Sequence, residues 1–172
     1  NHAQLGWSYY FAGRLDESAE AFRTASKLSS GHMEAGLGIS LTRLLAGDGQ
    51  GALDEAAKET SEMFRLWGQA LAYHALGKQV ESDNALDELI QKYEKNRPVA
   101  VASVYARRGD SDQAFEWLEK EITYRDDLLV WVSAEPLFAG IHDDSRWQPF
   151  LRKHGMAPEQ LAVIEFEVKL PE

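Results

Sequence analysis

The side chains that most often do chemistry form no catalytic pattern in this sequence. The chain has no cysteine, which excludes thiol catalysis, zinc sites of the cysteine type and disulfide bonds. It has neither a glycine-rich phosphate loop nor a Gly-x-Ser-x-Gly motif. The five histidines lack the spacing of metal ligands: His2, His32, His74, His142 and His154.

Two acidic pairs are the remaining candidates for acid–base or metal chemistry. Asp126-Asp127 and Asp143-Asp144 have no neighbouring nucleophile and no sign of a cleft, so a hydrolase built on two carboxylates is not indicated. His142 precedes the second pair and gives it the look of a metal site, but acidic pairs are common at the start of a helix. We therefore expect no enzyme activity, no catalytic residue, no metal and no cofactor.

The composition is that of an acidic globular chain. Hydrophobic residues make up 44% and charged residues 27% of the 172 residues, a length that suits one domain. No apolar run approaches the roughly 20 residues that span a bilayer. The net charge of −10 disfavours nucleic acid and anionic membranes as partners, because both need a basic face. We expect a cytoplasmic location, or a periplasmic one if the parent protein has a transmembrane helix upstream.

Four copies of one short pattern determine how the chain is organised. Each copy has a glycine, a small residue five positions on and a packing residue four further on. The copies are Gly13-Ser18-Phe22, Gly47-Ala52-Ala56, Gly77-Ser82-Leu86 and Gly109-Ala114-Leu118. The glycines lie 34, 30 and 32 residues apart (47−13, 77−47 and 109−77). A period of this length predicts a stacked array of helical hairpins.

Each position of the pattern has a physical role. The glycine ends the first helix of a hairpin, because it adopts a positive φ without steric cost. Small residues seven positions before it allow the two helices to approach closely. These residues are Gly6, Ser40, Ala70 and Ala102. The positions four before it hold large residues in three of the four copies: Tyr9, Arg43, Tyr73 and Tyr105. The pattern predicts helices over 3–12, 16–28, 33–46, 50–61, 63–76, 80–94, 98–108 and 111–124.

These residues resemble the tetratricopeptide repeat (TPR), whose pattern is W-x2-L-G-x2-Y, then A-x3-F, then P. Leu5-Gly6-x2-Tyr9 with Ser18-x3-Phe22 matches closely, and the third and fourth copies match in part. The second copy departs at Arg43 and Ala56, and the closing proline is missing from all four.

The resemblance implies an all-α, right-handed superhelix of stacked helical hairpins over residues 1–125, with units of about 1–30, 31–62, 63–94 and 95–125. Because the Leu5-Gly6 match places residue 1 inside a helix, we expect a fragment of a longer array or a multidomain protein.

Residues 126–172 form a different segment, which we expect to be a C-terminal helical cap. Asp144 or Ser145 predicts the start of a helix that ends near Gly155, Pro158 starts a short helix, and 166–170 alternates like a strand. Pro136-Leu137-Phe138 and Asp144-Ser145-Arg146-Trp147 resemble the end of repeat regions in bacterial signalling proteins, with Ser145 in place of a proline. Those proteins are class III adenylate cyclases, serine/threonine kinases and winged-helix regulators.

In the TPR family the first helix of each hairpin lines a concave surface. Family members that bind chaperone tails hold a carboxylate there with Lys and Asn, and here the equivalent places hold Ala3, Trp7, Leu41, Trp67 and Leu71. The resemblance therefore implies an apolar groove for a protein or peptide. Its candidate residues are Trp7, Tyr10, Phe11, Leu41, Leu44, Phe64, Trp67, Leu71, His74, Ser103 and Arg107.

Two alternatives remain open for this groove. Upstream repeats, or the chain's own tail through Phe166, Val168 and Leu170, would cover it. The open apolar end around Leu5, Trp7 and Phe11 would instead make the chain an oligomerisation module. The function that we expect first is a non-catalytic scaffold, the regulatory part of a larger bacterial protein.

Overall fold

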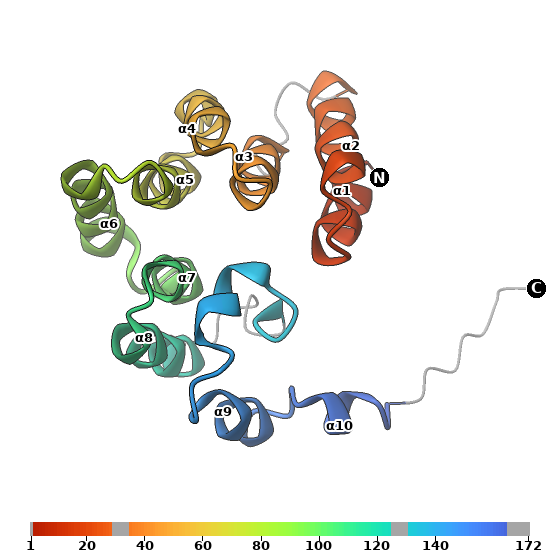
Figure 1. Cartoon of the computed structure of the whole chain (residues 1–172), viewed down its shortest axis with the longest axis vertical. Helices are drawn as coiled ribbons and strands as arrows, with labels where there is room; N and C mark the ends of the chain where they lie inside the picture. The colour runs from red at the N-terminus through yellow and green to blue at the C-terminus, as the bar shows by residue number, and fades with distance from the viewer. Residues whose placement is uncertain (1, 29–34, 125–130, 165–172) are drawn as a thin grey trace, which may run out of the picture.

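The computed structural model describes residues 2–28, 35–124 and 131–164, and these residues form helices and no strand. Eight helices make four antiparallel hairpins that wind round an arc (Figure 1). The second helix of the first two hairpins packs on the first helix of the next hairpin. The expected all-α superhelix of stacked hairpins is confirmed. The hairpins are α1 (His2–Phe11) with α2 (Leu15–Leu28), α3 (Ala35–Leu45) with α4 (Gly49–Lys58), α5 (Glu62–Ala75) with α6 (Gln79–Tyr93), and α7 (Pro98–Arg108) with α8 (Ser111–Tyr124).

The helix bounds agree with the expected ones to within three residues, and α7 and α8 match them at both ends. The chain then adds a 3-10 helix, η2 (Pro136–Ile141), and two short helices, α9 (Trp147–Lys153) and α10 (Pro158–Leu161). Figure 1 shows η2 inside the arc, beside α7, and α9 below α8. The alternating stretch 166–170 lies outside the described residues.

The four repeat glycines end the first helix of each hairpin in the left-handed conformation. Their φ angles are 71° at Gly13, 82° at Gly47, 71° at Gly77 and 76° at Gly109. In every hairpin the residue after the glycine donates its amide hydrogen to the carbonyl of the residue four positions before the glycine, at 2.9 to 3.0 Å. This hydrogen bond satisfies a carbonyl that the end of the helix would leave unpaired. The sequence pattern and the turn geometry therefore agree in all four units.

A serine hydroxyl joins the two helices of a hairpin in three of the four units. Ser18 donates to the carbonyl of Gly6 at 2.9 Å, and Ser82 donates to that of Ala70 at 2.6 Å. In the second hairpin the serine is on the other helix, where Ser40 donates to the carbonyl of Ala52 at 2.8 Å. Each pair is twelve residues apart and buried, so the helices meet at the same point whichever helix carries the hydroxyl.

The fourth hairpin has alanine at both of these positions, Ala102 and Ala114, and both are completely buried. It therefore keeps the close approach without the hydrogen bond.

The departure at Arg43 has a compensating partner. In the first and third hairpins, the cation of Arg14 or Lys78 lies over the ring of Tyr9 or Tyr73, at 4.5 and 5.9 Å from the centroid. In the second hairpin Arg43 stands at the tyrosine position, and Asp48 stands at the cation position. Their side chains form an ion pair at 2.7 Å. In the second hairpin an ion pair thus replaces the contact between a cation and a tyrosine ring across the turn, and this unit folds like the others.

The first two hairpins pack around Phe22, whose side chain is completely buried on α2. A Cβ atom added at Gly6 would come within 2.8 Å of its ring, and one added at Gly38 would come closer still. Two glycines on different helices therefore make the space for one phenyl ring. This contact joins the first hairpin to the second.

We expect Gly38→Ala to destabilise the protein, because the new methyl group overlaps the Phe22 ring and overpacking costs about 1–3 kcal/mol. Gly36→Ala is the matched control on the same helix. Its methyl group would meet the end of one side chain, the Glu59 carboxylate, and not a packed ring, and alanine favours a helix over glycine by about 1 kcal/mol. Chemical denaturation measures both. A Gly38→Ala protein as stable as the Gly36→Ala protein would contradict this packing.

Candidate partner-binding surface

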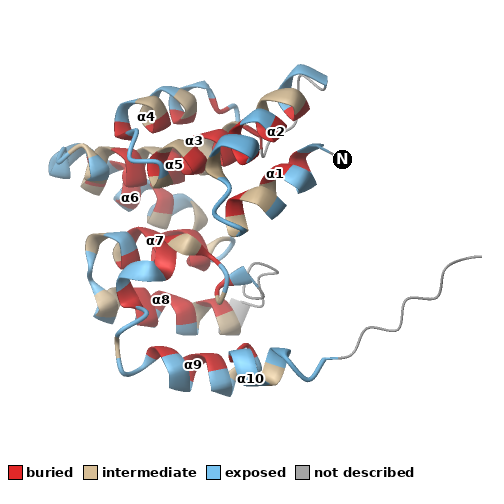
Figure 2. Ribbon diagram, turned by 45° about the vertical axis from the view of Figure 1, so that its right-hand side comes forward, coloured by how far each residue is buried: buried red, intermediate tan, exposed pale blue. Residues whose placement is uncertain are grey.

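The first helices of the hairpins line the inside of the arc. Helix α3 contacts both α1 and α5, and α5 contacts α7, so the four first helices form a continuous inner wall. The segment that contains η2 lies against α7 of this wall (Figure 1). Most residues of α7 are buried (Figure 2). The inner side is therefore in part already occupied by the chain itself.

The structure divides the eleven expected groove residues into two sets. Six have buried side chains: Tyr10, Leu41, Leu44, Trp67, Leu71 and Ser103. Four are half-buried, and Arg107 is exposed. The half-buried four are Trp7, Phe11, Phe64 and His74. A partner that meets the protein in this conformation can reach only the second set.

Trp67 shows why an aromatic residue on an inner helix need not be a binding anchor. Its indole N–H donates to the hydroxyl of Ser103 at 2.9 Å, and that hydroxyl donates to the carbonyl of Ala100 at 2.8 Å. Both side chains are buried. Trp67 and Ser103 therefore join α5 to α7 and stabilise the wall.

Tyr10 makes a hydrogen bond to a residue far along the chain. Its hydroxyl donates to the Glu135 carboxylate at 2.6 Å, and the same oxygen accepts from the Leu137 amide at 3.1 Å. Glu135 is only 9% exposed, and its burial raises the pKa of the carboxyl group above the usual value. Burial and the neighbouring carboxylate likewise raise the pKa of Tyr10. The positive charge of Arg107 acts on Tyr10 in the opposite direction.

Phe11 makes the second contact between the same two parts of the chain. Its ring stacks on Trp131 with centroids 5.2 Å apart and planes inclined by 6°. Trp131 remains 51% exposed. Phe11 also stacks on Trp7, with centroids 6.2 Å apart and planes inclined by 30°. We call the Tyr10–Glu135 and Phe11–Trp131 contacts together the clasp, because they join the first hairpin to the segment after α8.

Residues from Trp131 to Ile141 occupy part of the inner face. Phe166, Val168 and Leu170 lie outside the described residues, and the observed contacts come from Trp131, Glu135 and η2. Sequence reasoning missed Trp131 and Glu135 as parts of the site. The available signal was an acidic residue directly before the apolar run Pro136-Leu137-Phe138, a place where its side chain can cap a helix.

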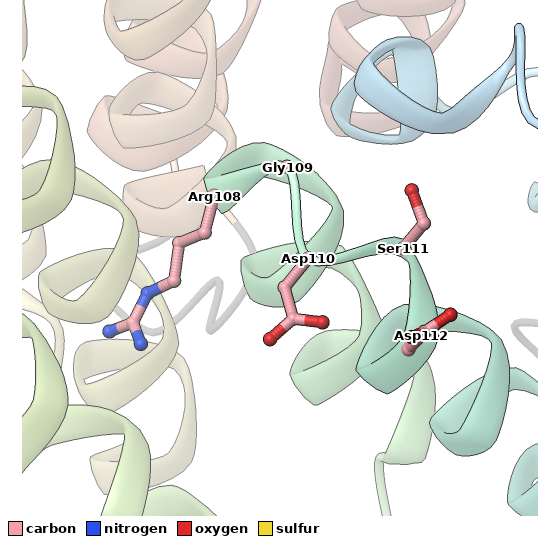
Figure 3. Close-up of a pocket in the computed structure, with 5 residues that line it drawn as sticks. All are labelled: Arg108, Gly109, Asp110, Ser111 and Asp112. Carbon is pink, nitrogen blue, oxygen red and sulfur yellow. The ribbon is translucent and has the colours of Figure 1, made fainter.

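A second concave region lies at the turn between α7 and α8 and is polar. Arg108, Gly109, Asp110, Ser111 and Asp112 line an open hollow of about 470 Å³ (Figure 3). The arginine points away from it and binds Ser82 and Asp83, at 2.7 and 2.8 Å. Asp110 accepts from the amide of Gln113 and caps α8. These side chains are used structurally and form no catalytic arrangement.

Among residues 2–28, 35–124 and 131–164, no group of three or more His, Asp or Glu side chains is placed to hold a metal ion. None of the helices in those ranges combines the length and the apolar character that crossing a membrane requires.

Comparison with protein families identifies a known repeat in the third hairpin. The tetratricopeptide repeat model matches residues 66–96, which cover most of α5 and all of α6. The matched hairpin is TPR-like. The matched stretch contains Gly77, Ser82 and Leu86, so the model and the sequence pattern find the same hairpin. Comparison with curated proteins and with solved structures found no match. TPR repeats are in general non-catalytic scaffolds that bind proteins or peptides, so the repeat suggests a protein–protein interaction scaffold.

The clasp leads to a prediction about Glu135. Its pKa is raised in the folded state, so folding favours the protonated form. The stability from this group is complete below the usual glutamate pKa of 4.5 and is lost as the pH rises through the folded-state value. Glu135→Gln keeps an acceptor for Tyr10 and Leu137 without the charge. We expect this variant to be at least as stable as the parent at pH 7, with the difference shrinking towards pH 4.5.

Glu135→Ala is the control, because it leaves two donors without their acceptor and should cost about 1–3 kcal/mol. Urea denaturation at several pH values measures all three proteins. The account fails if the glutamine variant is as unstable at pH 7 as the alanine variant.

Proposed function

We propose that the chain is a non-catalytic scaffold that binds a peptide or protein segment on the inner side of its arc. The observation that carries the proposal is that this side already holds a polypeptide segment. Side chains of α1 contact Trp131 and Glu135, and α7 packs against η2. A surface that recognises a folded-back segment of its own chain has the shape and the chemistry to recognise a similar segment of another protein.

The accessible part of this surface combines aromatic faces with one cation. Trp7, Phe11, Phe64 and His74 are half-buried, and Arg107 is exposed. Aromatic rings and arginine supply a large share of the binding energy at protein interfaces. The expected ligand is therefore a peptide with apolar or aromatic residues and an acidic group. The net charge of the chain is negative and would repel an acidic peptide. The preference for an acidic group therefore rests on the local positive charge of Arg107.

The wider setting is part of the same proposal. The resemblance of Pro136-Leu137-Phe138 and Asp144-Ser145-Arg146-Trp147 to the end of repeat regions in bacterial signalling proteins supports a regulatory role in such a protein. We propose the cytoplasm as its compartment, and the periplasm as the alternative if a transmembrane helix lies upstream in the parent.

Selection from a phage-displayed peptide library, followed by hydrogen-exchange mapping, tests the scaffold function. We expect the selected peptides to protect α1, α3, α5 and α7. Arg107→Glu should weaken their binding by about five- to tenfold, or roughly 1 kcal/mol, because it reverses the exposed cation. Lys95→Glu, in an exposed loop between α6 and α7, is the matched control and should leave binding unchanged. Peptides that protect only the outer helices, or whose affinity is unchanged by Arg107→Glu, would contradict binding at the inner surface.

Self-association through the open end of the array is the second candidate function. Leu5 on α1 is 43% exposed, which favours a contact at this end. The other residues expected there have partners within the chain. Trp7 packs against Phe22 at 5.0 Å, and Phe11 stacks on Trp131. Sedimentation over a range of concentrations tests this candidate: it requires a dimer that Leu5→Glu dissociates, and a monomer at high concentration rules it out.

A further inference from the structure

The segment after α8 has a fixed part and a peripheral part. In η2, Leu137, Phe138 and Ile141 are buried, and Gly140 lies so close to the Ala106 carbonyl that an added Cβ would come within 2.6 Å of it. These contacts hold η2 on α7. Trp131, by contrast, is half exposed and touches α1 through one face of its ring. The first hairpin is thus joined to this segment by the half-exposed Trp131 ring and by the buried Tyr10–Glu135 hydrogen bond.

The clasp contacts are of a kind that a peptide can reproduce. Phe11 offers a ring face, and Tyr10 offers one O–H donor. Trp131 and Glu135, which occupy them, are four residues apart in sequence. The positive charge of Arg107 acts electrostatically on Tyr10. Holding Glu135 at this place has an energetic cost, because burial disfavours the charged carboxylate and raises its pKa.

We propose that Trp131 and Glu135 are an internal stand-in for the partner, and that the partner is a peptide with an aromatic residue followed four positions later by a carboxylate. The partner's ring takes the place of Trp131 on Phe11, and its carboxylate accepts from Tyr10. The proposal rests on the scaffold function and names the ligand class and the regulation of that surface. Because Trp131 and Glu135 are tethered, their high effective concentration keeps the site closed against weak ligands.

The probe for this proposal is a fluorescein-labelled synthetic peptide with the sequence of residues 131–136, Trp-Val-Ser-Ala-Glu-Pro. Fluorescence anisotropy measures its affinity for the parent protein and for the Trp131→Ala/Glu135→Ala variant. Removing the tethered competitor should tighten binding by at least about tenfold. A control peptide with alanine in place of its glutamate should lose this gain.

Substitutions at Tyr10 and Tyr9 show whether the gain arises at the clasp. Tyr10→Phe, added to the double variant, removes the O–H donor and should abolish the gain. Tyr9→Phe is the matched control, because Tyr9 is the adjacent residue on α1 and lies under Arg14 instead. Circular dichroism verifies that all variants are folded. Equal affinity for the parent and the double variant overturns the proposal, and so does a gain that survives Tyr10→Phe.

The outcomes also separate this proposal from the scaffold function. If library peptides bind the inner helices with the expected Arg107 dependence but the hexapeptide gains nothing from the double variant, only the clasp proposal falls. If neither binds, both fall. If the parent forms a dimer that the hexapeptide dissociates, the occupant is a second copy of this chain and not a partner peptide, which also overturns the proposal.

Discussion

The close approach of two helices at one pair of small residues is the constraint on which the rest of the structure depends. In the first hairpin the pair is Gly6 and Ser18, and its equivalents in the other hairpins are also small and lie twelve residues apart. A larger side chain at either place would separate the helices and leave a void. Since each hairpin must offer its neighbours the same surface, one altered pair would disturb the stacking on both sides.

This repeated geometry also explains how the inner surface forms. Hairpins of similar shape, stacked with a regular rotation, bring α1, α3, α5 and α7 to one side, and the arc brings α1 towards the segment after α8 (Figure 1). Packing between repeats buries the middle of the inner wall, through pairs such as Trp67 and Ser103. The residues left for a partner are half-buried or exposed, such as Phe11 beside the returning segment and His74 on α5.

The sequence predicts the helices and turns well, because each depends on residues close together in the chain. The glycines require a left-handed conformation wherever the repeat ends a helix, and Gly109 at φ 76° follows this rule as closely as Gly13 at 71°. The second repeat looked defective at Arg43 because the pattern names residue types and not interactions. Its ion pair with Asp48 replaces a cation over a tyrosine ring, so a contact across the turn is kept although the residue types differ.

The candidate site was harder to predict, for a physical reason. Phase along a repeat tells which residues face inward, but not whether a neighbouring repeat covers them. Whether Tyr10 meets Glu135 depends on the curvature accumulated over four hairpins, which no single repeat specifies.

The Tyr10–Glu135 hydrogen bond spans 125 residues and lies beside the Phe11–Trp131 stack, whereas most contacts between the described helices join elements that are close in sequence. Hairpin arrays form from local contacts, which close short loops and fold quickly, whereas a contact of this span must wait until the intervening chain is ordered. The arc is therefore assembled before it is closed. Closure reports on the whole array, because disorder in any one of the four hairpins would move Tyr10 out of reach of its acceptor.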